Sequence, residues 1–148
     1  MKFEIPRPMK LEHDELPDLV NATKAGGKTG DAATAVAKVL HSHFIKEEEY
    51  ALPPLALLAA LSEDKFETGM ASVLKMTDKL KAELPTMLLE HQDIVAALKK
   101  LSEAASAENK PDVEHFAEKL MLHAQSEEQV AYPTALLIGR YVKSKLAA

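Results

Sequence analysis

Two pairs of histidine and glutamate are the residues of this sequence best suited to chemistry. Each pair has the spacing His-x-x-x-Glu: His43 with Glu47, and His123 with Glu127. Residues four apart lie on one face of an α-helix, about one turn from each other, so the imidazole and the carboxylate can point at one centre. Nitrogen and oxygen ligands with coordination positions left open suit iron(II). Each pair is therefore a predicted part of a metal site.

Both pairs belong to an internal duplication. Leu11–His13 and Leu89–His91 both read Leu-Glu-His, and a proline stands ten residues after His43 and again after His123. Each half supplies two imidazoles and one carboxylate, and two such sets suit two metal ions bridged by the glutamates. A single His-x-x-x-Glu motif is commonly a surface ion pair. A repeated set is not expected in an ordinary helical core, because burying these groups is costly unless they are paired or metal-bound. The predicted ligands are His13, His43, Glu47, His91, His123 and Glu127.

Composition limits the scaffold and the metal. The chain has 148 residues, 47% of them hydrophobic and 28% charged, which is typical of one globular domain. Aromatic residues make up only 5%, so the core is built from Leu, Ala, Val and Met, which suits helices. Cysteine is absent, which excludes thiolate zinc sites, iron–sulfur clusters and a cysteine nucleophile.

Charge and hydropathy exclude other classes of partner. The net charge of −5 and the scattered lysines argue against nucleic acid. No apolar run approaches the roughly 20 residues that span a bilayer, and the N-terminus has no signal-peptide core. We therefore expect a cytoplasmic protein without membrane contact, whose oligomeric state the sequence leaves open.

Four helical regions are expected to position the six ligands. Residues 1–8 read as an extended arm, because Pro6 and Pro8 disfavour helix. The expected helices run from Met9 to Ala25, from Ala32 (capped by Asp31) to Leu61, from Ser62 to Ala105 with a kink at Pro85, and from about Asp112 to Tyr132, with a further piece to Lys145. Short polar connections favour antiparallel neighbours, hence an all-α, up-down-up-down four-helix bundle in a single domain, 1–148. The first repeat spans about 9–61, the second about 85–133, and a C-terminal helical extension about 134–146.

These residues resemble the hemerythrin-like family, also called the histidine–histidine–glutamate cation-binding domain. The resemblance extends from Leu11 to Pro133 and covers four histidines and two glutamates in the family's order. It implies that His13, His43, Glu47, His91, His123 and Glu127 hold two non-haem iron ions, with Glu47 and Glu127 bridging beside an oxo or hydroxo group. Manganese and zinc remain alternatives. Ferritin-like di-iron bundles carry Glu-x-x-His instead, in the reverse order and at shorter spacing.

Two features depart from the oxygen-carrying hemerythrins. The carriers have a His-x-x-x-His pair on the third helix, whereas the residues four before and four after His91 are Met87 and Val95. One iron thus lacks an imidazole, which weakens the case for reversible oxygen transport. In addition, Pro17 removes the hydrogen bond to the carbonyl of His13 and is expected to bend the first helix beside the metal.

Other polar residues near the ligands are assigned by helical phase. Tyr50, seven residues after His43, falls on the inward face, either as a core residue or as a hydrogen-bond donor or ligand of the iron that lacks an imidazole. Tyr132 falls on the side opposite His123 and is expected to be structural. His41 and His115 are expected to face solvent. The glutamates adjoining the ligands, Glu12, Glu48, Glu90 and Glu128, point away from the site, where one or two can orient an imidazole. The expected pocket lining is Leu40, Leu88, Leu98, Phe116, Leu120 and Val130.

The leading hypothesis is a di-iron protein that binds oxygen, nitric oxide or peroxide as a sensor, scavenger or carrier. A di-iron oxidase, peroxidase or oxygenase acting on an organic substrate is one alternative. Iron storage or delivery is the other.

Overall fold

The computed structural model describes residues 1–13 and 16–148, and the side chains of residues 1–10 and 18–148. In order, the elements are α1 (Arg7–His13), α2 (Leu16–Thr23), α3 (Gly27–Lys46), η1 (Glu47–Ala51), η2 (Pro53–Leu57), α4 (Leu58–Ser62), η3 (Thr68–Val73), α5 (Leu74–Ala107), α6 (Pro111–Ser126), η4 (Glu127–Ala131) and α7 (Tyr132–Ala147). Elements η1 and η4 are π-helical turns, while η2 and η3 are 3₁₀ helices. The prediction of an all-α chain is confirmed for the described residues.

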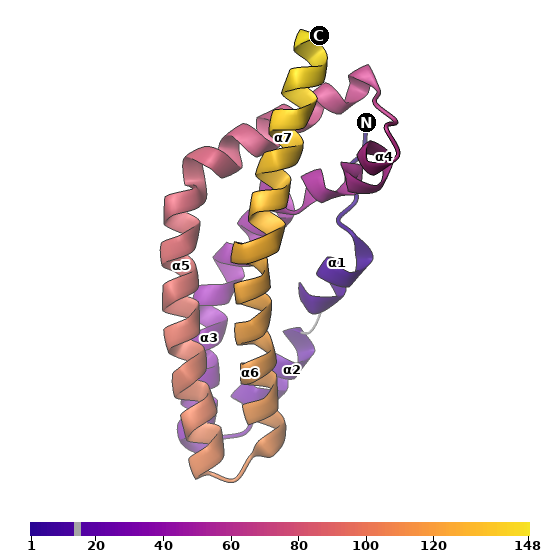
Figure 1. The fold of residues 1–148 in the computed structure, drawn as a ribbon. Coiled ribbons are helices and arrows are strands. Elements are labelled where there is room, and N and C mark those ends of the chain that lie inside the picture. Colours follow the sequence, from indigo (N-terminus) through magenta and orange to yellow (C-terminus); the bar gives the residue numbers. More distant parts are fainter. Residues whose placement is uncertain (14–15) are drawn as a thin grey trace.

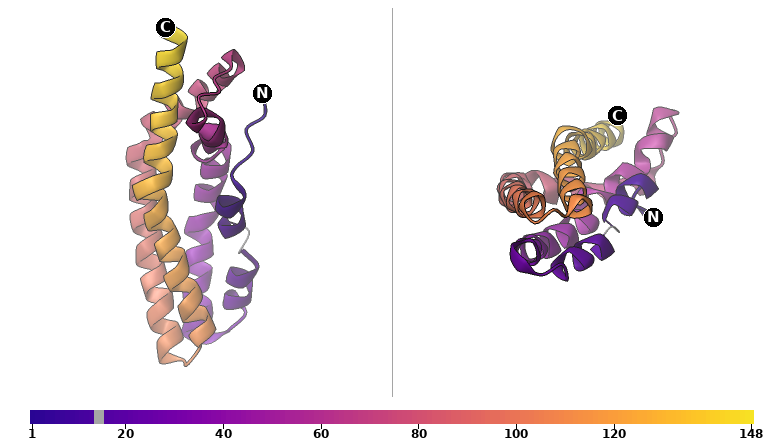
Figure 2. Two further views of the ribbon diagram at one scale, coloured as in Figure 1. Left: turned by 45° about the vertical axis from the view of Figure 1, so that its right-hand side comes forward. Right: turned by 90° about the horizontal axis from the view of Figure 1, so that it is seen from below.

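The long helices lie side by side. Helix α5 packs against α3 and α6, and α2 packs against α3 and α6 (Figure 1). Connections of three residues, 24–26 and 108–110, reverse the chain between α2 and α3 and between α5 and α6. Helix α7 continues the column of α6 toward the C-terminus, as the side view in Figure 2 shows. No helix in the described part of the chain has the length and apolar character needed to cross a membrane.

Helix α3 begins at Gly27, earlier than the predicted start at Ala32. Gly26 and Gly27 both have positive φ, 72° and 59°, which glycine adopts without a steric penalty. The side chain of Glu108, from the loop after α5, accepts hydrogen bonds from the backbone N–H of Thr29 (2.7 Å) and from its hydroxyl (2.6 Å). These bonds lower the pKa of Glu108. The prediction of Asp31 as the N-cap is wrong, because a carboxylate distant in the sequence satisfies the first turn.

The predicted start of the third helix is also wrong. Ser62 ends α4, and its hydroxyl donates to the carbonyl of Ala59 instead of capping a following helix. The chain re-enters helix at Thr68, and α5 then runs for 34 residues with Pro85 inside it. Figure 1 shows α5 bent in its first half, as expected for a proline that lacks an N–H and crowds the preceding turn.

The first helical region begins earlier than predicted. Helix α1 starts at Arg7, with Pro8 in its first turn, where a missing N–H costs nothing. The extended arm is therefore shorter than residues 1–8. A single helix was predicted from Met9 to Ala25; the structure gives α1 and α2 over this range, and residues 14–15 lie outside the described residues. The predicted bend at Pro17 also stays a prediction, because the side chain of this proline lies outside the described part of the chain.

The same π turn occurs in both halves of the duplication. The N–H of Leu52 donates to the carbonyl of Glu47 (2.8 Å), and the N–H of Tyr132 donates to the carbonyl of Glu127. Each bond spans five residues and ends just before a proline, Pro53 or Pro133. A proline cannot donate to the carbonyl four residues earlier and clashes with it, so a wider turn relieves the contact.

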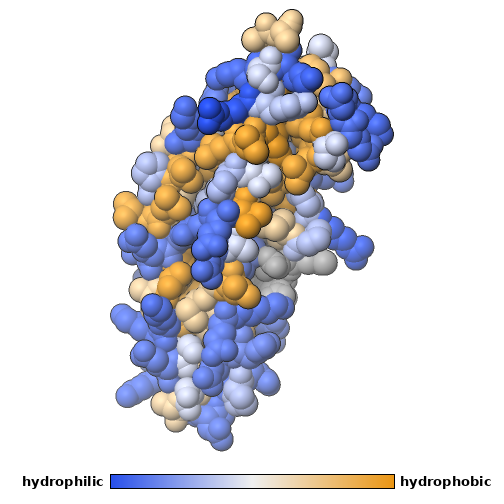
Figure 3. All heavy atoms as spheres, viewed as in Figure 1, coloured by the Kyte–Doolittle hydropathy of each residue, from blue (hydrophilic) through white to orange (hydrophobic). Residues whose placement is uncertain are grey.

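Two apolar clusters enclose a polar layer. The α7 cluster includes Leu52, Leu80, Met87, Tyr132 and Ile138, from η1 to η3, α5 and α7. The α2 cluster includes Leu19, Leu40, Phe44, Ile94 and Leu120, from α2, α3, α5 and α6. The predicted ligands whose side chains are described lie along the chain between these sets and are buried. On the face shown in Figure 3, apolar side chains gather in the half nearer the C-terminus, and the opposite end is mainly hydrophilic.

Candidate metal centre

Four predicted ligands meet in the interior. His43 comes from the last turn of α3, Glu47 from the start of η1, His91 from the middle of α5, and Glu127 from the start of η4. One ligand atom from each of these residues lies within 4.8 Å of the corresponding atoms of the other three, and all four side chains are buried. Residues from four elements far apart in the sequence thus converge on one centre.

The Nε2 atoms of three histidines face the carboxylates. Nε2 of His43 lies 3.2 Å from Oε1 of Glu47. On the other side of the centre, Nε2 of His91 and Nε2 of His123 lie 3.6 Å and 3.3 Å from the two carboxylate oxygens of Glu127. Helix α6 therefore brings His123, the fifth predicted ligand, to the same group.

The Nδ1 atoms point outward, toward a second pair of glutamates. Nδ1 of His91 lies 3.0 Å from Oε1 of Glu128, and Nδ1 of His43 lies 3.6 Å from Oε1 of Glu90, which also accepts from Lys46 at 3.0 Å. An outer carboxylate at Nδ1 fixes the orientation of an imidazole and leaves Nε2 to ligate a metal. The expectation that one or two adjoining glutamates orient a ligand fits Glu128 best.

The electrostatics of this group fit a cation. Burial, followed by a hydrogen bond with Glu127 and the charge of Glu127, raises the pKa of Glu47 well above its usual value. Burial and the neighbouring His91 lower the pKa of His43 to about 4. The imidazole is thus neutral, as a metal ligand must be, while two carboxylates crowd the same buried centre. A divalent cation would offset their charge, so these residues fit a metal ion.

Tyr132 lies at the same centre, contrary to the prediction that it is structural and faces away from His123. Its side chain is only 1% exposed. The hydroxyl donates to Oε2 of Glu47 at 2.6 Å and lies 3.0 Å from Nε2 of His91 and 3.3 Å from Nε2 of His43. Burial, followed by the charges of Glu47 and Glu127, raises the pKa of Tyr132, so the phenol is neutral beside them.

The π turn explains this error. In a regular α-helix the nine residues from His123 to Tyr132 make about two and a half turns, which puts them on opposite sides. The turn at η4 takes up one extra residue, so the rotation about the helix axis from His123 to Tyr132 falls to about two and a quarter turns. Tyr132 is thereby brought to the inward side. The sequence signal for this π turn was Pro133, six residues after Glu127.

The π turn of the first half has the opposite outcome for Tyr50, because it takes this residue away from the inward face. Tyr50 is buried, at 3% exposed, but its ring packs in the α7 cluster, and Nζ of Lys79 lies 4.8 Å from the ring centroid. Its hydroxyl has no hydrogen-bond partner among the described residues. Burial and nearby glutamates raise the pKa of Tyr50 to about 12. The core assignment of Tyr50 is favoured over the ligand assignment.

A small cavity adjoins the ligands. Its volume is about 10 Å³, close to the ~10–15 Å³ that holds one water molecule. The lining consists of Leu40, His43, Phe44, His91, Ile94, Leu120, His123, Ala124 and Glu127. The predicted lining is therefore correct for Leu40 and Leu120, while Leu98 and Phe116 are buried in the α2 cluster away from the cavity.

Two of the predicted lining residues lie elsewhere. Val130 is 62% exposed, because the π turn rotates it away from the predicted ligands, and Leu88 is only half-buried. Three residues that were not among the predicted lining, Phe44, Ile94 and Ala124, also line the cavity. The sequence signal was their closeness to the predicted ligands: Phe44 and Ala124 directly follow His43 and His123, and Ile94 lies three residues after His91.

The remaining histidines divide as expected. His41 and His115 are exposed and do not join the cluster. His13 ends α1, but its side chain lies outside the described residues. Five of the six predicted ligands are thus brought together by the described part of the structure.

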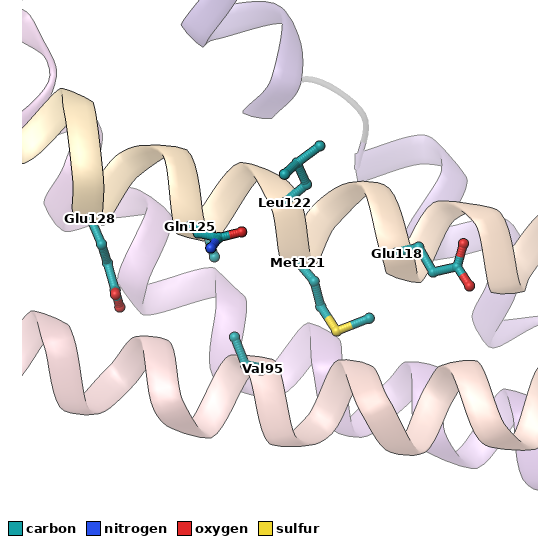
Figure 4. A pocket seen from close by; sticks show the side chains of 7 residues that line it. Val95, Glu118, Met121, Leu122, Gln125 and Glu128 are labelled. Atoms are coloured by element: carbon teal, nitrogen blue, oxygen red, sulfur yellow. The ribbon is translucent and has the colours of Figure 1, made fainter.

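A larger groove lies outside the centre, between α5 and α6. Figure 4 shows Val95 of α5 facing Met121 and Glu128 across it, and its volume is about 420 Å³. Val95, one of the two positions four residues from His91, lines this groove and is not among the residues that line the cavity. None of the predicted ligands whose side chains are described lines the groove, but Glu128, which does, lies 3.0 Å from Nδ1 of His91, and Ala124 lines both the groove and the cavity.

Comparison with known families gives one match. A family model described as the hemerythrin HHE cation-binding domain matches residues 5–135, which include all six predicted ligands. No curated protein and no solved structure matches the chain.

Proposed function

Because the chain belongs to the hemerythrin HHE cation-binding domain family, we propose that it holds two iron ions and binds oxygen or a related small molecule, nitric oxide or peroxide. In this proposal the ligands are His13, His43, Glu47, His91, His123 and Glu127, with the two glutamates bridging, in an antiparallel four-helix bundle whose first column is formed by α1 and α2. The role is that of a sensor, scavenger or carrier.

The observation that carries the proposal is the buried convergence of three Nε2 atoms on two carboxylates. Such a group is costly to bury without a compensating cation, and its pKa shifts have the directions expected of a ligand set for a cation. The donors are nitrogen and oxygen only, which suits ferrous iron with open positions. Ferrous iron, when bound, supplies the electrons and the open coordination positions that a small oxidant requires.

The chain's own residues define what can reach the metal. Glu128, 3.0 Å from Nδ1 of His91, holds that ring so that its Nε2 points inward, and Glu90 lies 3.6 Å from Nδ1 of His43. Leu40, Phe44 and Ile94 close the inner side of the cavity with apolar groups and exclude bulk water. The cavity has room for a ligand of water or diatomic size, which favours oxygen or nitric oxide over any organic molecule.

Two alternatives remain weaker. An oxidase or peroxidase needs room for an organic substrate beside the metal, whereas the cavity at the predicted ligands has a volume of about 10 Å³ and the larger groove at Val95 is lined by none of those ligands whose side chains are described. Iron storage or delivery needs release of the metal, whereas the ligands lie in a buried layer between two apolar clusters.

Anaerobic loading with ferrous iron tests the proposal. We expect two iron ions per chain by elemental analysis, and a change of the optical spectrum when one equivalent of oxygen is added. The matched variants His43→Ala and His41→Ala lie two residues apart on α3, and only the buried position should lose iron. The pair His123→Ala and His115→Ala provides the same control on α6.

Three results would contradict the proposal. Protein isolated from its own cells with full occupancy by zinc would exclude the redox role. Equal loss of iron in the His41→Ala and His43→Ala variants would exclude the ligand set. Repeated turnover of an organic substrate with oxygen or peroxide would favour the enzyme.

A further inference from the structure

The phenol oxygen of Tyr132 lies among the ligand atoms at distances typical of one coordination sphere. It is 2.6 Å from Oε2 of Glu47, 3.0 Å from Nε2 of His91 and 3.3 Å from Nε2 of His43. Two atoms that each lie about 2.1 Å from one metal ion, at right angles to each other, are about 3 Å apart. The oxygen of Tyr132 is therefore placed as a further donor among the ligands.

This placement is built into the backbone. The π turn η4 and Pro133 rotate Tyr132 inward, and its ring lies 5.4 Å from that of His91 at an interplanar angle of 29°. At the matching position of the first half stands Leu52, which is fully buried and offers no donor atom. The ligand set is thus asymmetric: a phenol is added on one side of a centre in which the residues four before and four after His91, Met87 and Val95, offer no imidazole.

We propose that Tyr132 is a seventh protein ligand of the metal pair, binding ferric iron through its phenolate oxygen next to His91 and Glu47. This inference rests on the proposed function, since it requires iron at the site. Tyrosine is an iron ligand in other proteins. On binding, the O–H bond breaks and an Fe–O bond forms, one proton leaves to solvent, and the oxidation state of the iron does not change.

A phenolate ligand bears on the choice among carrier, scavenger and sensor. An anionic oxygen donor stabilises ferric over ferrous iron, because the attraction grows with the charge of the ion. A site with this ligand is harder to reduce than one with neutral imidazole in its place. The phenolate therefore favours irreversible reaction with oxygen or peroxide over reversible transport.

Visible absorption and resonance Raman spectra of the ferric protein test the assignment. The protein is loaded with ferrous iron and oxidised by air, and iron content is measured on the same samples. We expect a tyrosinate-to-iron charge-transfer band, with tyrosinate ring vibrations enhanced on excitation into it. The chain has three tyrosines, so the source can be assigned completely. In Tyr132→Phe both signals should be lost.

A second variant avoids any effect of Tyr132→Phe on folding. Tyr50→Phe combined with Tyr141→Phe leaves Tyr132 as the sole tyrosine, and this protein should keep the band and the ring vibrations unchanged. Wild-type protein that takes up two irons without tyrosinate vibrations would overturn the inference and leave the proposed function intact. Loss of the vibrations in the double variant would overturn it equally. Failure of the wild type to bind iron would instead overturn the proposed function itself.

Discussion

The two halves of the duplication share a local turn but differ in the element after that turn. Both have a buried glutamate whose carbonyl accepts an N–H five residues later, just before a proline. In the first half Pro53 is followed by Pro54, and the chain continues as a 3₁₀ helix and the short α4. In the second half Pro133 lies in the first turn of α7, which runs on for 16 residues. A second proline removes a further N–H, so the residue after the first proline decides whether the helix continues.

One kind of turn, used twice, creates an asymmetric site. The turn rotates the position three after each glutamate away from the ligands and the position five after it toward them. Three residues after the glutamate stands Tyr50 in the first half and Val130 in the second. Five residues after it stands Leu52 in the first half and Tyr132 in the second. Of these four residues, Tyr132 alone directs a polar group at the cluster of predicted ligands. The duplication supplies equal imidazoles and carboxylates, and single residues outside the motif make the halves differ.

The largest effect is expected from removing either of the two carboxylates that we propose to bridge the metal ions. Glu127 faces two imidazoles, and Glu47 faces His43 and Tyr132. Glu127→Gln and Glu47→Gln should each weaken iron binding by more than the ~10–100-fold that loss of an outer partner causes. Metal titration followed by elemental analysis measures this. If Glu47→Gln kept two irons while Glu127→Gln lost them, the halves would not share the metals as the duplication implies.

A smaller effect is expected from the outer glutamates, and here the halves can be compared directly. Glu128 lies at Nδ1 of His91, and the duplication makes Glu48 its counterpart for His13. Glu128→Gln should weaken iron binding about 10–100-fold. Glu48 also pairs with Lys10 at 2.6 Å. An effect of Glu48→Gln equal to that of Glu128→Gln would support the symmetric role, whereas an effect reproduced by Lys10→Met would assign Glu48 to the ion pair alone.

Glu47→Gln is also expected to raise the melting temperature of the metal-free protein at neutral pH by a few degrees. The pKa of Glu47 is raised on folding, so between its unfolded value near 4.5 and the folded value the native state holds more protons. Stability is therefore lost as pH rises through this window, and glutamine does not titrate. The advantage of Glu47→Gln should grow from pH 4.5 upward.

His43 acts in the opposite direction. Its pKa falls to about 4 on folding, so stability is lost as pH falls from 6.5 toward that value. Both proteins contain His43, so the difference between them reports Glu47 together with the influence of Glu47 on His43, whose Nε2 lies 3.2 Å from it. Melting curves of the two metal-free proteins from pH 4 to pH 8 measure this difference. A constant difference across that range would contradict the assignment of the buried charge to Glu47.

The helical class and the convergence of His43, Glu47, His91, His123 and Glu127 could be predicted from the sequence because they depend on local periodicity and on the duplication. Spacing alone placed His43 with Glu47 and His123 with Glu127, as the structure has them. The start of α3 could not be predicted, because its first turn is satisfied by Glu108, 79 residues from Thr29. The directions of the side chains after Glu47 and Glu127 could not be predicted either, because one extra residue in each π turn rotates every later side chain about the helix axis.

The smallest effect is expected at Tyr50, the residue that regular helical phase pointed at the metal. Its hydroxyl is buried without a hydrogen-bond partner among the described residues, so Tyr50→Phe should leave stability unchanged within about 0.5 kcal/mol or raise it slightly. Iron content should also stay the same. Val130→Ala, at the exposed matching position, is the control, and it should be equally silent. A loss of one iron in Tyr50→Phe but not in Val130→Ala would mean that the turn at η1 relaxes when metal binds and returns Tyr50 to the inward face.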